Sequence, residues 1–457
     1  MIQLRPYQQS IVNEAKLLMQ RGNRKLLICA PTGSGKTALT SHMLGSAASK
    51  GLASFFIVHR RELVRQSITA FSKSNISYGV CAAGFIPSPE ATQICSIQTL
   101  RHRYTRLKRP SMIVWDEAHH ISAGTWDYIY KLYPQAYHIG LTATPRRMDG
   151  TGLRPWFSEI IQGPSVSWLI DNGFLCDYRV YAPPSMHLDG IKISGGDYVR
   201  SQLAHRIDRP SITGDAVREY QKRAPGKLAL AFCATVEHSK HVAEQFNAAG
   251  IPAEHVDGET DSYIRDRAMT RFANREIKVI TSVDIFGEGV DIPALECVIL
   301  MRPTKSLGLY LQQVGRVLRP SPGKELAIIL DLASNTEQHG LPDAEREWDL
   351  DGGKARSGGA SSVRTCPICY AAQAPGGLTC KYCGFLFIPE PREIDQIEGE
   401  LVAQAAETEI IKQRQDRKAE WRACKSLEDF AAMGQRRGYS PAWASVQMKL
   451  KRSWGHV

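Results

Sequence analysis

The chain lacks the features of a secreted or membrane-embedded protein. Its first residues, MIQLRPYQQS, have no succession of a basic region, an apolar stretch and small residues, which a secretory signal requires. Its longest apolar runs, such as LALAFCA at 228–234, are too short to cross the hydrocarbon core of a bilayer. These absences predict a cytoplasmic protein that has no membrane partner.

Clustered cysteines are also scarce. Of eleven cysteines, seven occur singly and mostly beside apolar residues, which is typical of buried thiols. The other four form two close pairs, a spacing typical of metal ligands. The seven single residues are Cys29, Cys81, Cys95, Cys176, Cys233, Cys297 and Cys424.

The overall composition excludes neither a globular fold nor a polyanionic partner. The chain is 43% hydrophobic and 23% charged, as ordinary folded proteins are. Its 457 residues exceed one ordinary core and predict roughly two to four domains. A formal charge of +11 suits nucleic acid, because lysines and arginines that neutralise phosphates release condensed counterions. Many basic proteins bind no polyanion, so the charge alone does not identify one.

Short apolar runs alternate with longer segments of helical period from residue 1 to about 345. This alternation is typical of a mainly parallel sheet that is covered by helices on both faces. We therefore predict two α/β domains with doubly wound parallel sheets, at 1–165 and 166–345. The expected strands are 26–30, 54–58, 93–97, 112–116 and 138–142, then 228–232, 253–257, 278–282, 297–301 and 326–330.

The remainder of the chain has a different composition. The stretch DGGKARSGGASS contains four glycines and no aliphatic residue larger than alanine, so we predict a flexible linker at 346–363. The cysteine pairs follow at 364–388, and a helical, basic tail follows at 389–457. Residues 401–457 contain eleven Lys and Arg against six Asp and Glu. Tyr439, Trp443 and Trp454 either stack on bases or form the core of a small helical unit, and we favour the core.

A phosphate-binding loop, APTGSGKT, follows the first expected strand. Glycines allow backbone N–H groups to surround a β-phosphate, Lys36 reaches the β- and γ-phosphates, and the Thr37 hydroxyl binds Mg²⁺. Ala30 stands where the general pattern has glycine. The predicted ATP contacts are Thr32, Gly33, Ser34, Gly35, Lys36 and Thr37.

The second half of an ATP site follows in MIVWDEAHH. Asp116 and Glu117 come at the carboxyl end of an apolar strand, where ligands bind in open α/β sheets. We expect Asp116 to hold Mg²⁺ through water. We expect Glu117 to orient and deprotonate the water that attacks ATP.

The tetrad Asp116-Glu117-Ala118-His119 resembles the DEAH form of motif II in superfamily 2 helicases, which contain two RecA-like domains. Other motifs of that superfamily follow in its order over residues 1–335. In the first half, the resemblance implies that Arg5 and Gln8 read adenine and that Arg61, Gln98 and Thr99 contact the nucleic-acid backbone. It also implies that His119, Thr142 and Thr144 couple the state of ATP to the nucleic acid.

Two further motifs of the superfamily lie in the second half. TSVDIFGEGVDIP resembles motif V, which implies that Gly289 and Asp291 lie near the nucleotide and Thr281 near the nucleic acid. QQVGRVLR resembles motif VI, which implies catalytic roles for Gln312, Arg316 and Arg319 beside Gly315. Since these arginines and Lys36 lie in different domains, transition-state stabilisation is complete only when the domains close over ATP.

The paired cysteines have the pattern C-x2-C-x10-C-x2-C. Four thiolates bind Zn²⁺ tetrahedrally and stabilise a module that has little core of its own. An iron–sulfur cluster or a redox pair are alternatives, and we favour a structural zinc ribbon. Such a ribbon binds either nucleic acid or a protein partner, as can the tail. The expected ligands are Cys366, Cys369, Cys380 and Cys383.

Helicase motifs followed by such a ribbon, and by the tail element GYSPAWA, resemble bacterial RadD-like helicases and related phage-encoded helicases. The resemblance implies single-stranded or branched DNA as the partner, rather than RNA, in a bacterial or phage-infected cytosol. It predicts an ATP-dependent helicase or translocase that acts in replication, recombination or repair. A motor subunit that requires a partner and a nucleotide-switched clamp that does not separate strands remain as alternatives.

Overall fold

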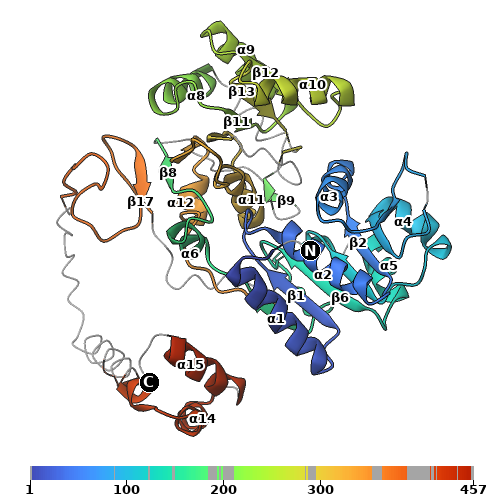
Figure 1. The fold of residues 1–457 in the computed structure, drawn as a ribbon. Helices are drawn as coiled ribbons and strands as arrows, with labels where there is room; N and C mark the ends of the chain where they lie inside the picture. The colour runs from blue at the N-terminus through green and yellow to red at the C-terminus, as the bar shows by residue number, and fades with distance from the viewer. Residues whose placement is uncertain are drawn as a thin grey trace. The chain divides into compact units, whose positions relative to one another are not determined.

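The structure is a computed structural model, and it forms two compact units at 1–387 and 388–457, each described by itself (Figure 1). Among the described residues no helix is both long enough and apolar enough to span a membrane. The described residues are 3–86, 88–121, 124–146, 150–183, 193–194, 197–198, 210–283, 285–286, 295–352, 363–388, 412, 416–417, 419–439 and 441–453.

The first lobe contains a seven-stranded sheet in the order β3-β4-β2-β5-β6-β1-β7. Every pairing in it is parallel. The strands are β1 Lys25–Cys29, β2 Ser54–Val58, β3 Gly79–Cys81, β4 Thr92–Ser96, β5 Met112–Trp115, β6 Tyr137–Thr142 and β7 Glu159–Gln162. Its helices are α1 Pro6–Gln20, α2 Lys36–Ser49, α3 Arg61–Lys73, α4 Ile97–Arg103 and α5 Gly124–Leu132, and α6 Val166–Asp171 follows.

The second lobe contains an eight-stranded sheet in the order β12-β13-β11-β14-β15-β8-β17-β16. Its first six strands in that order pair in parallel. The strands are β8 Tyr178–Tyr181, β11 Ala229–Phe232, β12 Ala253–Val256, β13 Val279–Ser282, β14 Cys297–Leu300, β15 Ala327–Asp331, β16 Arg364–Thr365 and β17 Ala371–Gln373. The helices are α8 Pro210–Arg223, α9 Val236–Ala248, α10 Ser262–Ala273, α11 Leu307–Val317 and α12 Asn335–His339, and β9 Ile193–Ser194 pairs with β10 Asp197–Tyr198.

The predicted fold class is confirmed, because two parallel α/β sheets are followed by a four-cysteine cluster and C-terminal helices. The central strands are apolar along their whole length, since helices cover both faces of a parallel sheet. Leu26, Leu27 and Ile28 of β1 are completely buried, as are Leu230 and Ala231 of β11. The proposed division at residue 165 stays a prediction. It falls between β7 of the first sheet and β8 of the second.

The cysteine module is not the separate appendage that its sequence predicted. Strand β17 pairs antiparallel with β8, and Ala371 and Ala372 are buried there. The backbone N–H of Ala182 also donates to the carbonyl of Tyr370 at 2.8 Å. Without β17, β8 would be an edge strand with unpaired backbone groups. The module therefore completes the second sheet. No local pattern in residues 364–388 predicts the pairing of β17 with β8.

Part of the predicted linker is also ordered on the first lobe. Leu350 is 1% exposed and packs in a hydrophobic cluster with Leu153 and Phe157. The glycine-rich composition that suggested a linker belongs mainly to residues 353–362, which lie outside the described residues. Residues 346–352 contain a tryptophan and a leucine, and these apolar side chains find partners that a linker would not have.

The second unit is a small helical unit with α14 Leu427–Arg436 and α15 Pro441–Ser453. Its core contains Phe430 and Met433, and Trp443 packs against them. The ring centroids of Tyr439 and Trp443 are 4.7 Å apart. Trp443 therefore packs against the core, as favoured, and Tyr439 contacts Trp443, while Trp454 lies outside the described residues.

Candidate nucleotide and metal sites

The phosphate-binding loop lies between β1 and α2, at the carboxyl end of the first sheet. Gly33 and Gly35 have φ values of 86° and 80°, in the left-handed region that strongly favours glycine. Lys36 begins α2, and its ammonium donates to the carbonyls of Ala30 at 3.1 Å and Pro31 at 3.4 Å. The Lys36 side chain therefore packs against the start of the phosphate-binding loop.

Two side chains of helix α1 donate hydrogen bonds to the backbone of this loop. The Tyr7 hydroxyl donates to the Ser34 carbonyl at 2.7 Å, and Gln8 Nε2 donates to the same oxygen at 3.0 Å. A Cβ atom on Gly35 would lie 2.4 Å from Gln8 Nε2, so any other residue there would displace the Gln8 amide from this position. The supporting role of Tyr7 was missed from the sequence, although it lies inside the LRPYQ motif.

Gln8 and Arg5, which the resemblance assigns to adenine, have well-defined partners. Gln8 is 3% exposed, and its Oε1 accepts from the backbone N–H of Arg5 at 3.0 Å. The Arg5 guanidinium lies 4.8 Å from the ring centroid of Phe174. Phe174 in turn stacks on Trp168, with centroids 5.9 Å apart. An exposed guanidinium beside stacked aromatic rings can bind a planar base.

Two carboxylates lie close together beyond β5. Burial and the neighbouring Glu117 carboxylate raise the pKa of Asp116 to about 7, while the charges of Lys36 and His59 act in the opposite direction. A crowded pair of carboxylates is stabilised by a cation between them or beside them. The oxygen donors at this point therefore suit Mg²⁺, which prefers carboxylates, phosphates and water.

The backbone at Glu117 is strained. Its φ of 48° and ψ of 56° lie in the left-handed region, which costs about 1 to 3 kcal/mol for a residue with a side chain. This conformation belongs to the turn that leads from β5 into the short helix Ala118–His120. Strain of this kind persists only where surrounding contacts impose it, and it commonly occurs at active sites.

The predicted coupling residues form one connected group. Glu117 Oε2 lies 3.5 Å from His119 Nδ1, which lies 3.2 Å from the Thr142 hydroxyl. Thr142 Oγ1 donates to the Thr144 carbonyl at 2.9 Å, so its hydroxyl proton is already used. With that hydroxyl orientation, the tautomer of His119 that carries a proton on Nδ1 can donate to Thr142. The carboxylate in motif II is thus linked to motif III through one histidine.

Helix α11 of the second lobe lies directly against the phosphate-binding loop. A Cβ atom on Gly315 would lie 2.6 Å from the Cβ of Thr32, and one on Gly33 would lie 3.6 Å from Arg319 Cγ. Gln312 and Arg316 of this helix are 4% and 6% exposed. The helix that contains Gln312 and Arg316 is therefore in contact with the loop that contains Lys36, and the catalytic roles of these residues stay predictions.

A second glycine of this helix was missed from the sequence. A Cβ atom on Gly308 would lie 2.9 Å from the Thr144 hydroxyl oxygen, so motif III and the start of α11 are in close contact. No local pattern distinguishes Gly308 from an ordinary helical glycine, because its partner lies in the other lobe.

Three of the predicted nucleic-acid residues lie at the edge of the first sheet that is formed by the carboxyl ends of its strands. Arg61 begins α3 after β2, whereas Gln98 and Thr99 follow β4. Strands β2 and β4 are neighbours, and Val58 pairs with Ser96 at their carboxyl ends. Arg61 and Gln98 are exposed, so this edge can contact a phosphate backbone.

Thr281 does not fit its predicted contact with nucleic acid. The side chain is completely buried, and its hydroxyl donates to the Ser239 carbonyl at 2.8 Å and accepts from the Ser239 hydroxyl at 3.0 Å. This correction has a physical cause, since a threonine inside a parallel strand points toward the covering helix α9. Gly289 and Asp291 lie outside the described residues.

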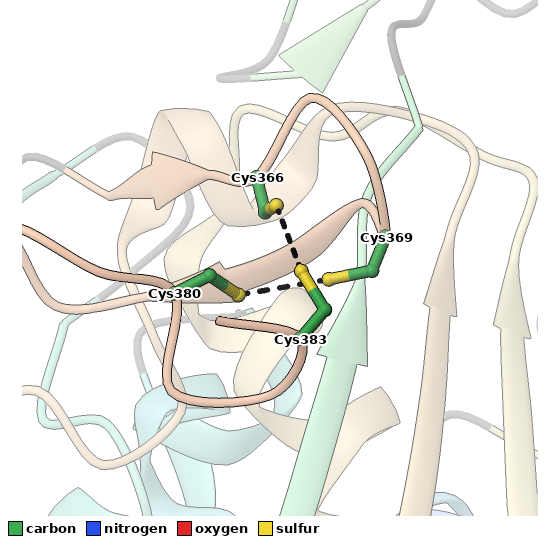
Figure 2. Close-up of side chains that lie close together, drawn as sticks. All are labelled: Cys366, Cys369, Cys380 and Cys383. Carbon is green, nitrogen blue, oxygen red and sulfur yellow. Dashed lines mark hydrogen bonds between the residues drawn. The ribbon is translucent and has the colours of Figure 1, made fainter. Parts of the chain in front are cut away.

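The four paired cysteines converge on one point (Figure 2). Their sulfur atoms all lie within 4.8 Å of one another, with 3.6 Å between Cys366 and Cys383 and between Cys369 and Cys380. Four thiolates around Zn²⁺ at about 2.3 Å would be separated by roughly 3.8 Å. The sulfur arrangement therefore fits a tetrahedral ion.

Each of the two cysteine pairs lies in a backbone turn of the same kind. The N–H of Tyr370 donates to the Cys366 carbonyl, and the N–H of Gly384 donates to the Cys380 carbonyl, both at 2.9 Å. Tyr370 and Gly384 both have positive φ values, 57° and 75°. Burial acts to raise the pKa of Cys366, but the N–H groups of Cys369 and Ile368 outweigh it and lower that pKa to about 7. The pKa values of Cys369 and Cys383 are raised instead. Burial raises the first, whereas at Cys383 the N–H of Phe385 acts to lower the pKa but is outweighed by desolvation and by hydrogen bonds to neighbouring thiols. The fit to a metal therefore rests on the sulfur positions.

Comparison with known proteins identifies the family. Residues 1–147 match the family described as "Type III restriction enzyme, res subunit", and residues 213–321 match "Helicase conserved C-terminal domain". A Lactococcus phage protein described as "51.5 kDa protein" is 36% identical, over 82% of this chain and 81% of its own length. The chain belongs to the superfamily 2 helicases. It is an ATP-dependent helicase or translocase, and hence an ATPase.

Other relatives are more distant. The Saccharomyces cerevisiae "Putative ATP-dependent helicase IRC3" is 26% identical over 72% of this chain, which spans about half of that protein, 51%. The "DNA 3'-5' translocase XPB2" of Sulfurisphaera tokodaii is 24% identical, over 76% of this chain and 85% of its own length.

Solved structures confirm the fold. A putative HsdR subunit of a type I restriction enzyme from Vibrio vulnificus aligns with a TM-score of 0.59 and 24% identity, over 74% of this chain and 65% of that one. The Type ISP restriction-modification enzyme LlaBIII bound to DNA aligns with a TM-score of 0.54 and 19% identity, over 72% of this chain and 27% of that one.

The contact between Gly315 and Thr32 can be tested by Gly315→Val. The added side chain cannot fit 2.6 Å from Thr32 Cβ, so the lobes should fail to close. We expect kcat to fall at least about tenfold, equivalent to about 1.4 kcal/mol of barrier, with a smaller loss of ATP affinity. Steady-state ATPase assays measure both. Gly124→Ala, where an added Cβ meets nothing within 4 Å, is the matched control, and equal kcat in the two variants would contradict the assignment.

The metal site can be tested by Cys380→Ser. The parent chain should contain about one zinc ion, as four thiolates forming one site imply, and the variant should contain none. Elemental mass spectrometry measures this content. Since β17 pairs with β8, loss of the ion should also lower the melting temperature of the second lobe. Iron in the parent, or zinc retained in the variant, would exclude a four-cysteine zinc ribbon.

Proposed function

We propose that this chain is a DNA helicase or translocase of the DEAH type that remodels duplex or branched DNA in replication, recombination or repair. The main support is the contact of the motif VI helix α11 with the phosphate-binding loop, since a Cβ on Gly315 would meet Thr32 at 2.6 Å. Each round of ATP binding and hydrolysis then closes and opens two lobes that both grip one strand.

The first lobe supplies the groups that bind and cleave ATP. Lys36 neutralises the β- and γ-phosphates, and Asp116 with Thr37 would hold Mg²⁺, which would neutralise the phosphate oxygens. Glu117 accepts a proton from water, whose oxygen attacks the γ-phosphorus while ADP departs. His119, in contact with both Glu117 and Thr142, holds that carboxylate in position.

The second lobe supplies positive charge only when the lobes are together. Arg316 and Arg319, assisted by Gln312, stabilise the charge that develops on the transferred phosphoryl group. Arg5 and Gln8 select adenine, and Phe174 provides a stacking surface for the base. Because hydrolysis removes the γ-phosphate, it also removes the group that both lobes bind.

DNA is the proposed partner, and RNA is the alternative that the assay must exclude. The relative from Sulfurisphaera tokodaii carries the description of a DNA translocase, and the LlaBIII structure is bound to DNA. Arg61, Gln98 and Thr99 line the edge at which the backbone would bind. We assign the chain to the RadD-like and phage-encoded group on its order of motifs and its four-cysteine ribbon, which we propose binds zinc and either DNA or a protein.

The proposal is tested by two displacement assays on the same protein. A strand-displacement substrate reports unwinding, and a triplex-displacement substrate reports translocation along duplex. We expect ATP-dependent activity on at least one, and no activity from Lys36→Ala or Glu117→Gln. Lys36→Ala should lose ATP binding, whereas Glu117→Gln should retain it, because Lys36 contacts the phosphates and Glu117 contacts the attacking water.

The outcome separates the proposal from its alternatives. Activity only on the triplex indicates translocation without unwinding, as in restriction motor subunits. ATP-dependent DNA binding without displacement on either substrate indicates a nucleotide-switched clamp and contradicts the motor. Normal turnover in Glu117→Gln would contradict its assignment as the base, and activity on RNA alone would contradict DNA as the partner.

A further inference from the structure

The end of the second lobe is firmly held. The Tyr310 hydroxyl donates to the Gly340 carbonyl at 3.0 Å, and the Tyr178 hydroxyl donates to the Asp343 carboxylate. Arg346 donates to four backbone carbonyls between His339 and Ala344. Up to this point the chain therefore belongs to the second lobe.

The next residues lie on the first lobe. Gln162 Nε2 donates to the Trp348 carbonyl at 2.7 Å, and the N–H of Arg154 donates to the Leu350 carbonyl at 2.9 Å. The Arg154 guanidinium binds both carboxylate oxygens of Asp351 at 2.8 Å. Leu350 fills a place in the core of that lobe. Backbone, charge and apolar contacts all attach this segment to the same surface.

Two glycines permit this attachment. A Cβ atom on Gly152 would lie 2.1 Å from the Leu350 carbonyl oxygen, and one on Gly352 would lie 2.4 Å from the Gly152 nitrogen. Thr151 and Gly352 form an antiparallel bridge at this point. The two backbones are therefore in direct contact, an approach that any side chain at either glycine would prevent.

The segment also reaches motif III. Arg146 follows Thr144 by two residues, and its guanidinium lies 5.7 Å from the ring centroid of Trp348 and 3.8 Å from the Asp349 carboxylate. Arg346 and Trp348 line a cavity of about 130 Å³ together with Leu311 and Val314 of α11. The segment therefore lies beside α11, the helix that contains Arg316 of motif VI.

We propose that residues 346–352, here named the strap, fasten the second lobe to the first beside motif III and hold the lobes near the closed arrangement between ATPase cycles. The chain between β7 and β8 connects the lobes once, and the strap connects them a second time. A second attachment raises the effective concentration of one lobe at the other. ATP then meets lobes that are already partly preorganised.

The strap predicts a specific kinetic defect when it is released. Apparent affinity falls in proportion to the population of the binding-competent state, so if that population falls to about a fifth, KM for ATP rises about fivefold. The value of kcat at saturating ATP should stay within about twofold, because Leu350 and Asp351 do not line the cavity beside the phosphate-binding loop. The variants are Leu350→Asp, which cannot be buried, and Asp351→Ala, which keeps the apolar contact.

Glu347→Gln is the matched control, since Glu347 belongs to the strap and is exposed. Fluorophores introduced through unnatural amino acids at the exposed positions Glu14 and Glu244 report the separation of the lobes without nucleic acid. We expect lower transfer efficiency in both strap variants than in the control. The charge-swapped pair Arg154→Asp with Asp351→Arg should restore transfer and KM toward the parent values.

Two results would overturn the strap. The first is that Asp351→Ala and Leu350→Asp have the same KM for ATP and the same transfer efficiency as the control Glu347→Gln. The other is a raised KM without any change in transfer efficiency, which would place the effect inside the ATP site. Since both measurements are made without nucleic acid, they are independent of whether the motor acts on DNA.

Discussion

The approach of α11 to the phosphate-binding loop is the constraint on which the rest of the site depends. Gly315 has no side chain where Thr32 lies, and Gly308 has none where Thr144 lies, so two motifs of the first lobe touch one helix of the second. This contact joins the helix that contains Arg316 to the loop that contains Lys36. In the proposed function it couples phosphate chemistry to movement of the lobes. On this proposal, neither lobe alone contains a complete ATPase site.

Two further parts of the chain, the strap and the four-cysteine module, are attached to the lobes that meet at this contact. The strap attaches the end of the second lobe beside Arg146, and the four-cysteine module pairs with β8 through β17. The module is therefore part of the second lobe and is not attached to it only by a linker. A ligand bound at the ribbon would be carried with the second lobe through each cycle, because Arg223 also donates to the Cys369 carbonyl at 2.8 Å.

The sequence predicted those features whose cause is local. All ten expected strands are present, because each contains apolar residues that its sheet buries, and the loop glycines are required by their own φ values. The short strands β3 and β7, the pairing of β17 and the strap were missed, since each is decided by a partner distant in sequence. Thr281 was misplaced for the same reason, because only the packing of α9 shows its hydroxyl to be internal.

The central claim is that the ATPase site is completed across the lobes, and Arg316→Ala tests it most directly. Arginines inserted from a second domain or protein typically contribute about 10³ to 10⁵ in kcat. The account predicts that kcat at saturating ATP and DNA falls by about three orders of magnitude, while ATP affinity of the open state changes little. Loss of ATP affinity with normal kcat would contradict it.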